Sequence, residues 1–281
     1  MANTFSMLRC GRFTLSLDRP LIMGIVNVTP DSFSDGGHFF DAARAVAHGL
    51  ELVAQGADLL DIGGESTRPG AVPVSEGEEL DRVLPVLEGL REARVPLSVD
   101  TQKPGVMRAA LAVGADMIND VNALLAPGAL AAVAASDAAV CLMHKQGEPR
   151  TMQVNPHYDD VVGEVRAFLA QRIAAAQAAG IAKERIVIDP GFGFGKNLQH
   201  NLELLRQLQA LLSLGVPVLA GLSRKSMLGS ITGASVEARV HASVAAALLA
   251  ARKGARILRV HDVRPTREAL AVVAAVEGWG A

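Results

Sequence analysis

Short apolar runs alternate with longer helical stretches along most of the chain. Eight runs lack the apolar–polar alternation of a half-buried strand, at residues 21–27, 57–62, 96–100, 116–120, 138–143, 185–189, 217–220 and 256–260. Such runs are typical of parallel strands that are buried on both faces of a sheet. A helical stretch is predicted after each of them, at residues 41–55, 76–93, 104–113, 128–135, 159–179, 198–212, 236–253 and 265–276.

Eight consecutive βα units predict an α/β protein with the (β/α)₈ TIM-barrel fold. No long linker or low-complexity segment separates the units, so residues 1–281 are predicted to form a single domain, with the barrel at 20–281. Residues 1–19 are an N-terminal extension, and 4–19 are predicted to form a hairpin that closes the barrel floor. An open doubly wound sheet is the structural alternative.

Local signals agree with the helix ends in this scheme. Ser75 is a suitable N-cap, with Glu78 three residues later to complete a capping box. Proline in the first turn and glycine just after the last turn are the usual markers of the two ends. The chain places them at Pro104 and Pro265, and at Gly56, Gly114, Gly180 and Gly254.

Composition excludes several classes of protein. The 281 residues include 27 basic and 29 acidic side chains, a net charge of −2, and half of them are hydrophobic. This excludes disorder and nucleic-acid binding by bulk charge. Cys10 and Cys141 have no metal-binding or CxxC spacing, which favours a reducing compartment. No apolar run is long enough to span a membrane and no signal sequence is visible, so a cytoplasmic protein without a membrane or nucleic-acid partner is expected.

Polar residues follow the predicted strands at the end where a barrel enzyme builds its site. They are Asn27, Asp61, Asp100, Asn119, Asp120, His144, Asp189, Ser223, Lys225, Arg259 and His261. We expect them to converge on one mouth, although each taken alone could be a helix cap or a buried hydrogen-bond partner. The loops 29–37 and 63–70 are rich in glycine and proline, which predicts lids that order when a ligand binds; ordinary connections are the alternative.

Longer motifs at the same strand ends resemble those of the dihydropteroate synthase family. They are GIVNVTPDSFSDGG from Gly24, DIGGESTRPG from Asp61, SVDT from Ser98, IND from Ile118, MH from Met143 with Gly147, DPGFGFGK from Asp189, SRK from Ser223 and RVHD from Arg259. This family joins 6-hydroxymethyl-7,8-dihydropterin pyrophosphate to p-aminobenzoate, releasing pyrophosphate and forming 7,8-dihydropteroate. The resemblance implies a folate-pathway transferase that is a sulfonamide target, requires Mg²⁺ and forms a homodimer through outer helices.

The resemblance also assigns residues to each ligand. The pterin is expected at Asp100, Asn119, Met143, Asp189 and Lys225, and the diphosphate at Asn27, Thr67, Arg68, Arg259 and His261. The p-aminobenzoate pocket is expected at Phe33, Arg68, Pro69, Phe194 and Ser223, and Asn27 is the expected protein ligand of Mg²⁺. The catalytic set is Asp100, Asp189, Lys225, Arg259 and His261.

These assignments make chemical sense. A flat ring with donors and acceptors on its edge needs buried carboxylates and amides, because unpaired polar edges are costly. Arg259 and His261 are two residues apart on a strand, so both can point into one mouth, although a surface pair is the alternative. Asp189 could instead be only a turn residue before Pro190.

An SN1-like reaction fits the candidate residues, because the arylamine is already a nucleophile and pyrophosphate is a good leaving group. Carboxylates would stabilise the pterin cation, and the cations would stabilise the departing anion. The run from Gly191 to Lys196 is neither a Walker loop nor a dinucleotide fingerprint, since its glycine spacing matches neither. Two other functions stay open: a methyltetrahydrofolate-dependent methyltransferase and a pterin-binding paralogue without turnover.

Overall fold

A parallel eight-stranded barrel forms the centre of the computed structural model, which describes residues 6–28, 38–66, 73–147 and 151–279. Its strands are β3 (Leu21–Asn27), β4 (Leu59–Gly63), β5 (Leu97–Asp100), β6 (Met117–Asp120), β7 (Ala139–Met143), β8 (Ile186–Asp189), β9 (Leu219–Ala220) and β10 (Ile257–Val260). Their order is β8-β7-β6-β5-β4-β3-β10-β9, and a parallel bridge between Ile188 and Val218 brings the two edges together. The barrel prediction is therefore confirmed over the open sheet.

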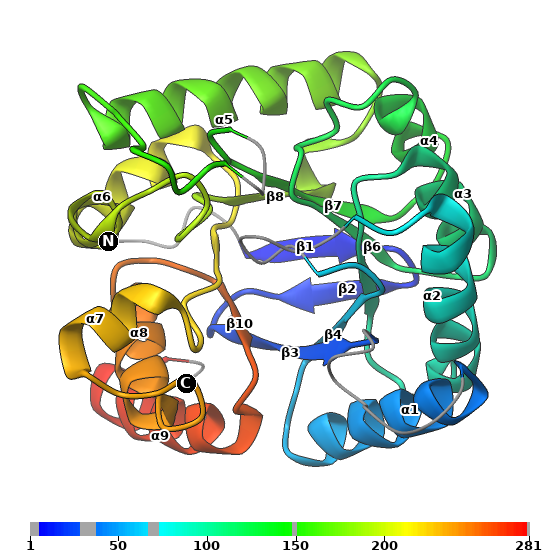
Figure 1. Ribbon diagram of the computed structural model, residues 1–281, viewed down its shortest axis with the longest axis horizontal. Helices are drawn as coiled ribbons and strands as arrows, with labels where there is room; N and C mark the ends of the chain where they lie inside the picture. The colour runs from blue at the N-terminus through cyan, green and yellow to red at the C-terminus, as the bar shows by residue number, and fades with distance from the viewer. Residues whose placement is uncertain (1–5, 29–37, 67–72, 148–150, 280–281) are drawn as a thin grey trace.

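Helices surround the barrel wall, as Figure 1 shows in the view down its middle. They are α1 (His38–Ala54), α2 (Glu76–Leu90), α3 (Pro104–Ala112), α4 (Ala129–Ala134), α5 (Val161–Ala178), α6 (Leu198–Arg206), α7 (Ser226–Thr232), α8 (Val240–Arg252) and α9 (Val263–Glu277). Ser75 and Glu78 form the predicted capping box at the start of α2. The four glycines predicted after helices have φ values of 95–101°, in the left-handed region.

Two helical predictions differ from the structure. The segment 198–212 is divided into α6 and a 3₁₀ helix, η3 (Leu208–Leu214). The last long helix before β10 starts at Val240 instead of residue 236, and the short helix α7 precedes it. The sequence of α7 contains glycine and β-branched residues, which favour helix weakly. Its Met227 and Leu228 are buried, so tertiary packing forms this helix where local propensity does not predict it.

An antiparallel hairpin closes the N-terminal end of the barrel, as predicted. Its strands are β1 (Met7–Cys10) and β2 (Phe13–Ser16), and they lie across the middle of the ring in Figure 1. The Arg12 guanidinium binds the carboxylate of Asp116, the residue just before β6, at 2.9–3.0 Å. The alternate side chains Leu8 and Cys10 are fully buried against the inner side chains of the barrel.

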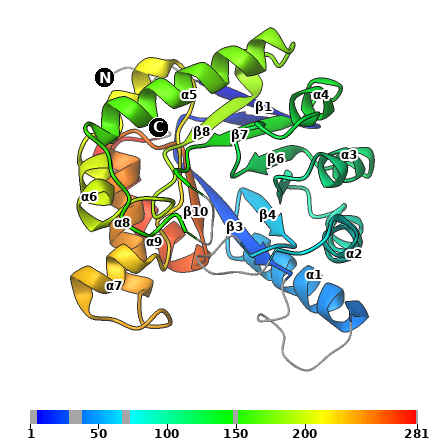
Figure 2. The same ribbon diagram turned by 45° about the horizontal axis from the view of Figure 1, so that its top comes forward.

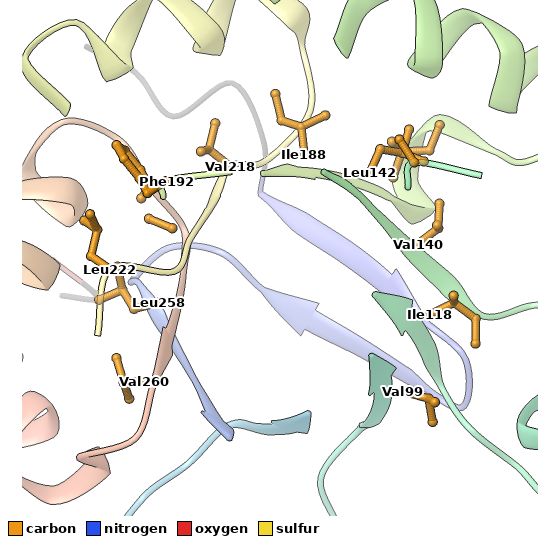
Figure 3. Close-up of a cluster of buried hydrophobic side chains, with 14 of the residues drawn as sticks. Val99, Ile118, Val140, Leu142, Ile188, Phe192, Val218, Leu222, Leu258 and Val260 are labelled. Carbon is orange, nitrogen blue, oxygen red and sulfur yellow. The ribbon is translucent and has the colours of Figure 1, made fainter. Parts of the chain in front are cut away.

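The wall separates two hydrophobic cores because successive strand residues point to opposite faces. Inward residues such as Met23, Leu59 and Val187 form the smaller core with the hairpin. Outward residues such as Val99, Ile118 and Leu258 pack under the helices, and Figure 3 shows them following the wall from β5 to β10. Figure 2, turned by 45°, shows the helices outside the strands. Among the described residues, no helix has the length and apolar character needed to cross a bilayer.

Candidate functional site

A cavity of about 660 Å³ opens among the C-terminal ends of the strands. Its lining includes most of the residues predicted for the site: Asn27, Asp100, Asn119, Met143, Asp189, Phe194, Ser223, Lys225, Arg259 and His261. The other predicted residues, Phe33, Thr67, Arg68 and Pro69, lie outside the described residues, as do the tips of both predicted lids. The structure therefore brings together every described residue of the predicted set.

Arg259 lines this cavity and links two carboxylates. Its Nε donates to Asp61 Oδ2 at 2.6 Å, and its terminal nitrogen donates to Asp100 Oδ2 at 2.9 Å. Asp61 is fully buried and also accepts from Ser98 Oγ at 2.6 Å and from Asn119 Nδ2 at 3.0 Å. A guanidinium has further N–H donors beyond these two, so Arg259 can still bind an anion while its side chain is held in place.

Burial changes the protonation of the two cavity aspartates. Desolvation raises the pKa of Asp100 to about 7; the charge of Arg259 opposes this, and the nearby Asp61 adds to it. Desolvation also raises the pKa of Asp189, against the charge of Lys225. With a pKa of about 7, the Asp100 carboxyl can be a neutral donor or a charged acceptor near neutral pH. Groups with perturbed pKa values, such as these two aspartates, gather at functional sites.

Lys225 is the cation opposite Asp189. Burial lowers its pKa to about 8, while the charge of Asp189 acts in the opposite direction. Its Nζ donates to the carbonyl oxygen of Phe192 and lies 4.7 Å from the centroid of the Phe194 ring. Asp189 Oδ1 accepts from the backbone N–H of Gly191 at 2.7 Å, so this residue closes a turn and also lines the cavity.

Ser223 and His261 form a second polar pair at the mouth. Ser223 Oγ lies 3.0 Å from His261 Nδ1, and the His261 backbone N–H donates to the same Oγ at 3.2 Å. The neighbouring Arg224 is ion-paired with Asp262 at 2.6 Å. The residue predicted for the p-aminobenzoate carboxylate and one predicted for the diphosphate are thus in direct contact.

The expectation that all polar strand ends converge on the mouth is wrong for Asp120 and His144. Asp120 accepts from the backbone N–H groups of Asn122 and Leu124, both at 2.7 Å, and shapes the turn after β6. His144 is buried beside Lys196, whose Nζ lies 2.9 Å from its Nδ1. Each follows an inward residue, Asn119 or Met143, by one position, so it points to the outer face. Counting alternate residues along the strands would have excluded both from the sequence alone.

Asp61 does point inward, but it lies beneath Arg259 and does not line the cavity. The structure adds lining residues that the sequence reasoning missed, among them Glu65, Met152 and Arg239. Glu65 belongs to the second long motif and is held by Lys103 Nζ at 2.8 Å. Met152 and Arg239 belong to no motif, but tertiary contacts bring them to the motif residues: Arg239 donates to the carbonyl oxygen of Arg224 at 3.0 Å, and Met152 packs against Gly147.

Comparisons with known proteins agree with this arrangement. The family model described as "Pterin binding enzyme" matches residues 23–261. The dihydropteroate synthase of Neisseria meningitidis serogroup C is 55% identical over 267 residues, covering 93% of this chain and 94% of that protein.

Two solved structures are also similar over nearly the whole chain. The dihydropteroate synthase of Xanthomonas albilineans with 4-aminobenzoic acid has a TM-score of 0.92 and 59% identity, covering 97% of this chain and 98% of that one. The structure of the same organism's enzyme with 7,8-dihydropteroate has a TM-score of 0.86 and 55% identity, with the same coverage.

Proposed function

The chain belongs to the pterin-binding enzymes, among the dihydropteroate synthases, and from this membership we propose how its cavity performs the transfer. The substrates are 6-hydroxymethyl-7,8-dihydropterin pyrophosphate and p-aminobenzoate, and the products are 7,8-dihydropteroate and pyrophosphate. The observation that carries the proposal is the set of buried polar groups in one cavity: two aspartates with raised pKa values, an asparagine and a lysine. A buried slot with such groups suits a flat heterocycle that has polar edges.

The pterin ring binds at the bottom of the cavity. Asp189 accepts from the amino-pyrimidine edge, Asp100 and Asn119 bind the other ring nitrogens, and Lys225 donates to the carbonyl side. Met143 packs against the ring. Asp189 and Asn119 are 5% and 7% exposed, so their hydrogen bonds to the ring are shielded from water. Each ring group left unpaired there would cost about 1–3 kcal/mol.

The diphosphate binds above the ring, at Arg259 and His261. Both side chains extend inward from the end of β10 and line the cavity. The unused N–H donors of Arg259 and the imidazole of His261 stabilise the leaving anion.

Mg²⁺ fits beside Asn27. The side-chain oxygens Asn27 Oδ1 and Asp100 Oδ2 both lie 4.0 Å from the point where Gly63 would carry a Cβ, so oxygen ligands face the same small space. No cluster of three or more His, Cys, Asp or Glu side chains suited to a metal occurs among the described residues, and magnesium suits such a site because it keeps most of its waters. Asn27 would hold the ion, which supplies charge neutralisation of the diphosphate. Full turnover after exhaustive chelation would contradict this role.

p-Aminobenzoate binds last, beside Phe194 and Ser223. The Phe194 ring covers one side of the arylamine, and Ser223 Oγ donates to the carboxylate. We propose that Phe33, Arg68 and Pro69 complete this pocket, with Thr67 and Arg68 reaching the diphosphate. Binding is then ordered, with the pterin substrate first, and calorimetry tests this order. Equal affinity of p-aminobenzoate for the free protein and for the protein with pterin and pyrophosphate would contradict it.

The reaction follows an SN1-like course. The bond between the pterin methylene carbon and the diphosphate oxygen breaks, and its electron pair leaves with pyrophosphate. The arylamine nitrogen then attacks the ring-stabilised cation and forms the new C–N bond. The ammonium so formed gives up one proton to the released pyrophosphate or to water. Asp100 and Asp189 stabilise the cation when ionised, whereas Arg259 and His261 stabilise the anion. None of these residues forms a covalent bond with the substrate.

A turnover assay with both substrates tests the proposal and separates it from its rivals. Formation of 7,8-dihydropteroate and pyrophosphate in equal amounts is expected. Methyl transfer from methyltetrahydrofolate would indicate the methyltransferase, and pterin binding without turnover would indicate the inactive paralogue.

We also propose a homodimer of single-domain protomers. Leu249 on α8 and Val272 and Val276 on α9 are 50%, 66% and 80% exposed, and these two helices are packed side by side. Such neighbouring apolar side chains favour burial against a second copy of the same face. Sedimentation of the protein and of its Val272→Glu variant tests this, because the variant is expected to be monomeric. The cytoplasmic location stays a prediction.

A further inference from the structure

The turn that follows β8, residues 190–196, packs its backbone against the chain that follows β7. Gly191 has a φ of 67°, and a side chain there would overlap the carbonyl oxygen of His144. This turn carries Phe194 into the cavity. Its conformation therefore determines where an aromatic wall of the site lies.

Side chains bind the backbone carbonyls of this turn one after another. Lys196 Nζ donates to Gly191 O and Phe194 O, Lys225 to Phe192 O, Gln153 to Gly193 O, Tyr158 to Gly195 O and Asn201 to Lys196 O. Because the turn belongs to no helix or strand, these bonds replace a regular backbone ladder. Lys196 supplies two of them, both at 3.0 Å.

The third N–H of the Lys196 ammonium points to His144 Nδ1 at 2.9 Å. Lys196 is 2% exposed and His144 is 6% exposed, so neither group is satisfied by bulk water. A lysine ammonium has only donors, so the imidazole nitrogen that faces it is the acceptor. Lys196 thus connects the end of β7 to both sides of the turn after β8, although neither it nor His144 lines the cavity.

We propose that Lys196, with His144 as its acceptor, is a positioning residue of the p-aminobenzoate site. The pair holds the turn so that Phe194 stands over the cavity and Phe192 O receives Lys225. This inference rests on the proposed function, since Phe194 is assigned there to the arylamine ring. It accounts for two buried groups that the reaction does not use: the outward-pointing His144 at the end of β7, and Lys196, which is not part of a phosphate loop.

The contact with His144 keeps the turn in place in both protonation states of Lys196. Burial lowers the pKa of Lys196 to about 7, Asp189 opposes this, and Lys225 adds to it. Burial and the charge of Lys196 lower the pKa of His144 to about 3, so the imidazole is neutral at physiological pH. Tyr158 and Phe168 also face His144 but carry no charge there. When Lys196 loses its proton, the imidazole can donate from Nδ1, and the lysine still donates to both carbonyls.

The first experiment compares Lys196→Met with Lys253→Met. Lys253 lies between α8 and β10, at the N-terminal end of the barrel, and its Nζ donates to the carbonyl oxygen of Arg206 near the surface. Its variant therefore removes a lysine–carbonyl bond far from the cavity. Lys196→Met is expected to raise KM for p-aminobenzoate about tenfold, with kcat changed less than about twofold, because two bonds that hold the turn are lost. Lys253→Met is expected to match the wild type. An unchanged KM in a folded Lys196→Met protein would overturn the inference.

The second experiment compares His144→Asn with His144→Leu and holds even if Lys196→Met fails to fold. Asparagine places an acceptor oxygen near the position of Nδ1, whereas leucine fills the space without an acceptor. A positioning role predicts that asparagine keeps KM near the wild-type value and leucine raises it. A packing role predicts the reverse order, and that result would overturn the inference.

Nitrogen NMR of labelled histidine provides a signature that does not depend on turnover. At a pH below 7, His144 Nδ1 is expected to be unprotonated, and a proton found on it there would contradict the assigned hydrogen bond. Failure of the proposed function is recognised separately, because the wild-type protein would then form no 7,8-dihydropteroate. If the wild-type protein is active and the variants have an unchanged KM for p-aminobenzoate, only the positioning role is rejected.

Discussion

At the N-terminal end of the barrel, two arginines bind the same aspartate, Asp58. At the C-terminal end, a single arginine, Arg259, binds two aspartates. Asp58 accepts from Arg19, from Arg267 and from the backbone N–H of Ile22. At the mouth, Asp61 and Asp100 share Arg259. These two clusters therefore combine arginine and aspartate in opposite ratios.

The partners of Asp58 and Asp100 shift their pKa values in opposite directions. Burial alone would raise the pKa of Asp58, but the hydrogen bonds from Arg19 and Ile22 and the charge of Arg267 outweigh it, so its pKa is lowered. At the mouth burial prevails, and the pKa of Asp100 rises to about 7. An aspartate with several cationic and N–H partners, such as Asp58, is held ionised at neutral pH and stabilises the fold. One that is short of partners remains able to bind a ligand.

The largest expected difference is in kcat, between the loss of Arg259 at the C-terminal end and the loss of Arg12 at the N-terminal end. Arg259→Met is expected to lower kcat by about 10²–10³-fold, because the developing anion loses its main cation. Arg12→Met, at the hairpin, removes the ion pair with Asp116 and is expected to leave kcat unchanged. Steady-state kinetics on both folded variants checks this. Comparable losses of kcat would show that the two ends are not separate in function.

The Asp189→Asn variant tests whether Asp189 is the carboxylate that accepts hydrogen bonds from the pterin. The carboxylate is proposed to accept from two donors of the pterin, and an amide can accept only one of these bonds without a clash of donors. The affinity for a pterin analogue is expected to fall about 5–150-fold, from the loss of about 1–3 kcal/mol. Titration calorimetry measures this, with circular dichroism to establish that the fold is intact. Unchanged affinity would reject Asp189 as the pterin acceptor.

The pH profile of kcat/KM reports the protonation of Asp100 and Lys225 in the cavity. Asp100 is ionised above its pKa of about 7, and Lys225 is charged below its pKa of about 8, so activity is expected to rise and then fall across this narrow range. Lys225→Arg should move the alkaline limb upward, since guanidinium stays charged. A profile that is flat from pH 6 to 9 would contradict both roles.

The smallest expected effect is on the pH dependence of stability, to which Asp58 and Asp100 contribute with opposite signs. The lowered pKa of Asp58 gives stability above the unfolded value of about 4, which is lost as the pH falls through the folded pKa. The raised pKa of Asp100 gives stability at low pH, which is lost as the pH rises through about 7.

Urea unfolding at several pH values tests this difference. Asp58→Asn should lower the free energy of unfolding at pH 7 by about 1 kcal/mol, the scale of one hydrogen bond to a buried group. Asp100→Asn should not lower it at pH 7 and should flatten the decline between pH 4 and 7. The same slope change in both variants would show that the two aspartates do not differ in this way.

The sequence by itself determined the barrel and the place of its site. Strand starts and ends, such as 21–27 for β3, follow from apolar runs and turn residues, which are local properties. The motifs at the strand ends identified many of the residues that line the cavity, although not Met152 or Arg239. Even the outward direction of Asp120 and His144 was available from the two-residue period of a strand.

Only the tertiary structure decided which charged groups are paired and how they shift one another's pKa values. The bond between Arg259 and Asp61 joins residues 198 positions apart, and no local pattern encodes it. The raised pKa of Asp100 depends on its burial and on four neighbouring charges, those of Arg259, Asp61, Glu79 and Asp120. Lys196 was visible in a glycine-rich run, but its acceptors at His144, Gly191 and Phe194 depend on how two loops pack. Electrostatic energies depend on distances between side chains, and folding alone brings these side chains together.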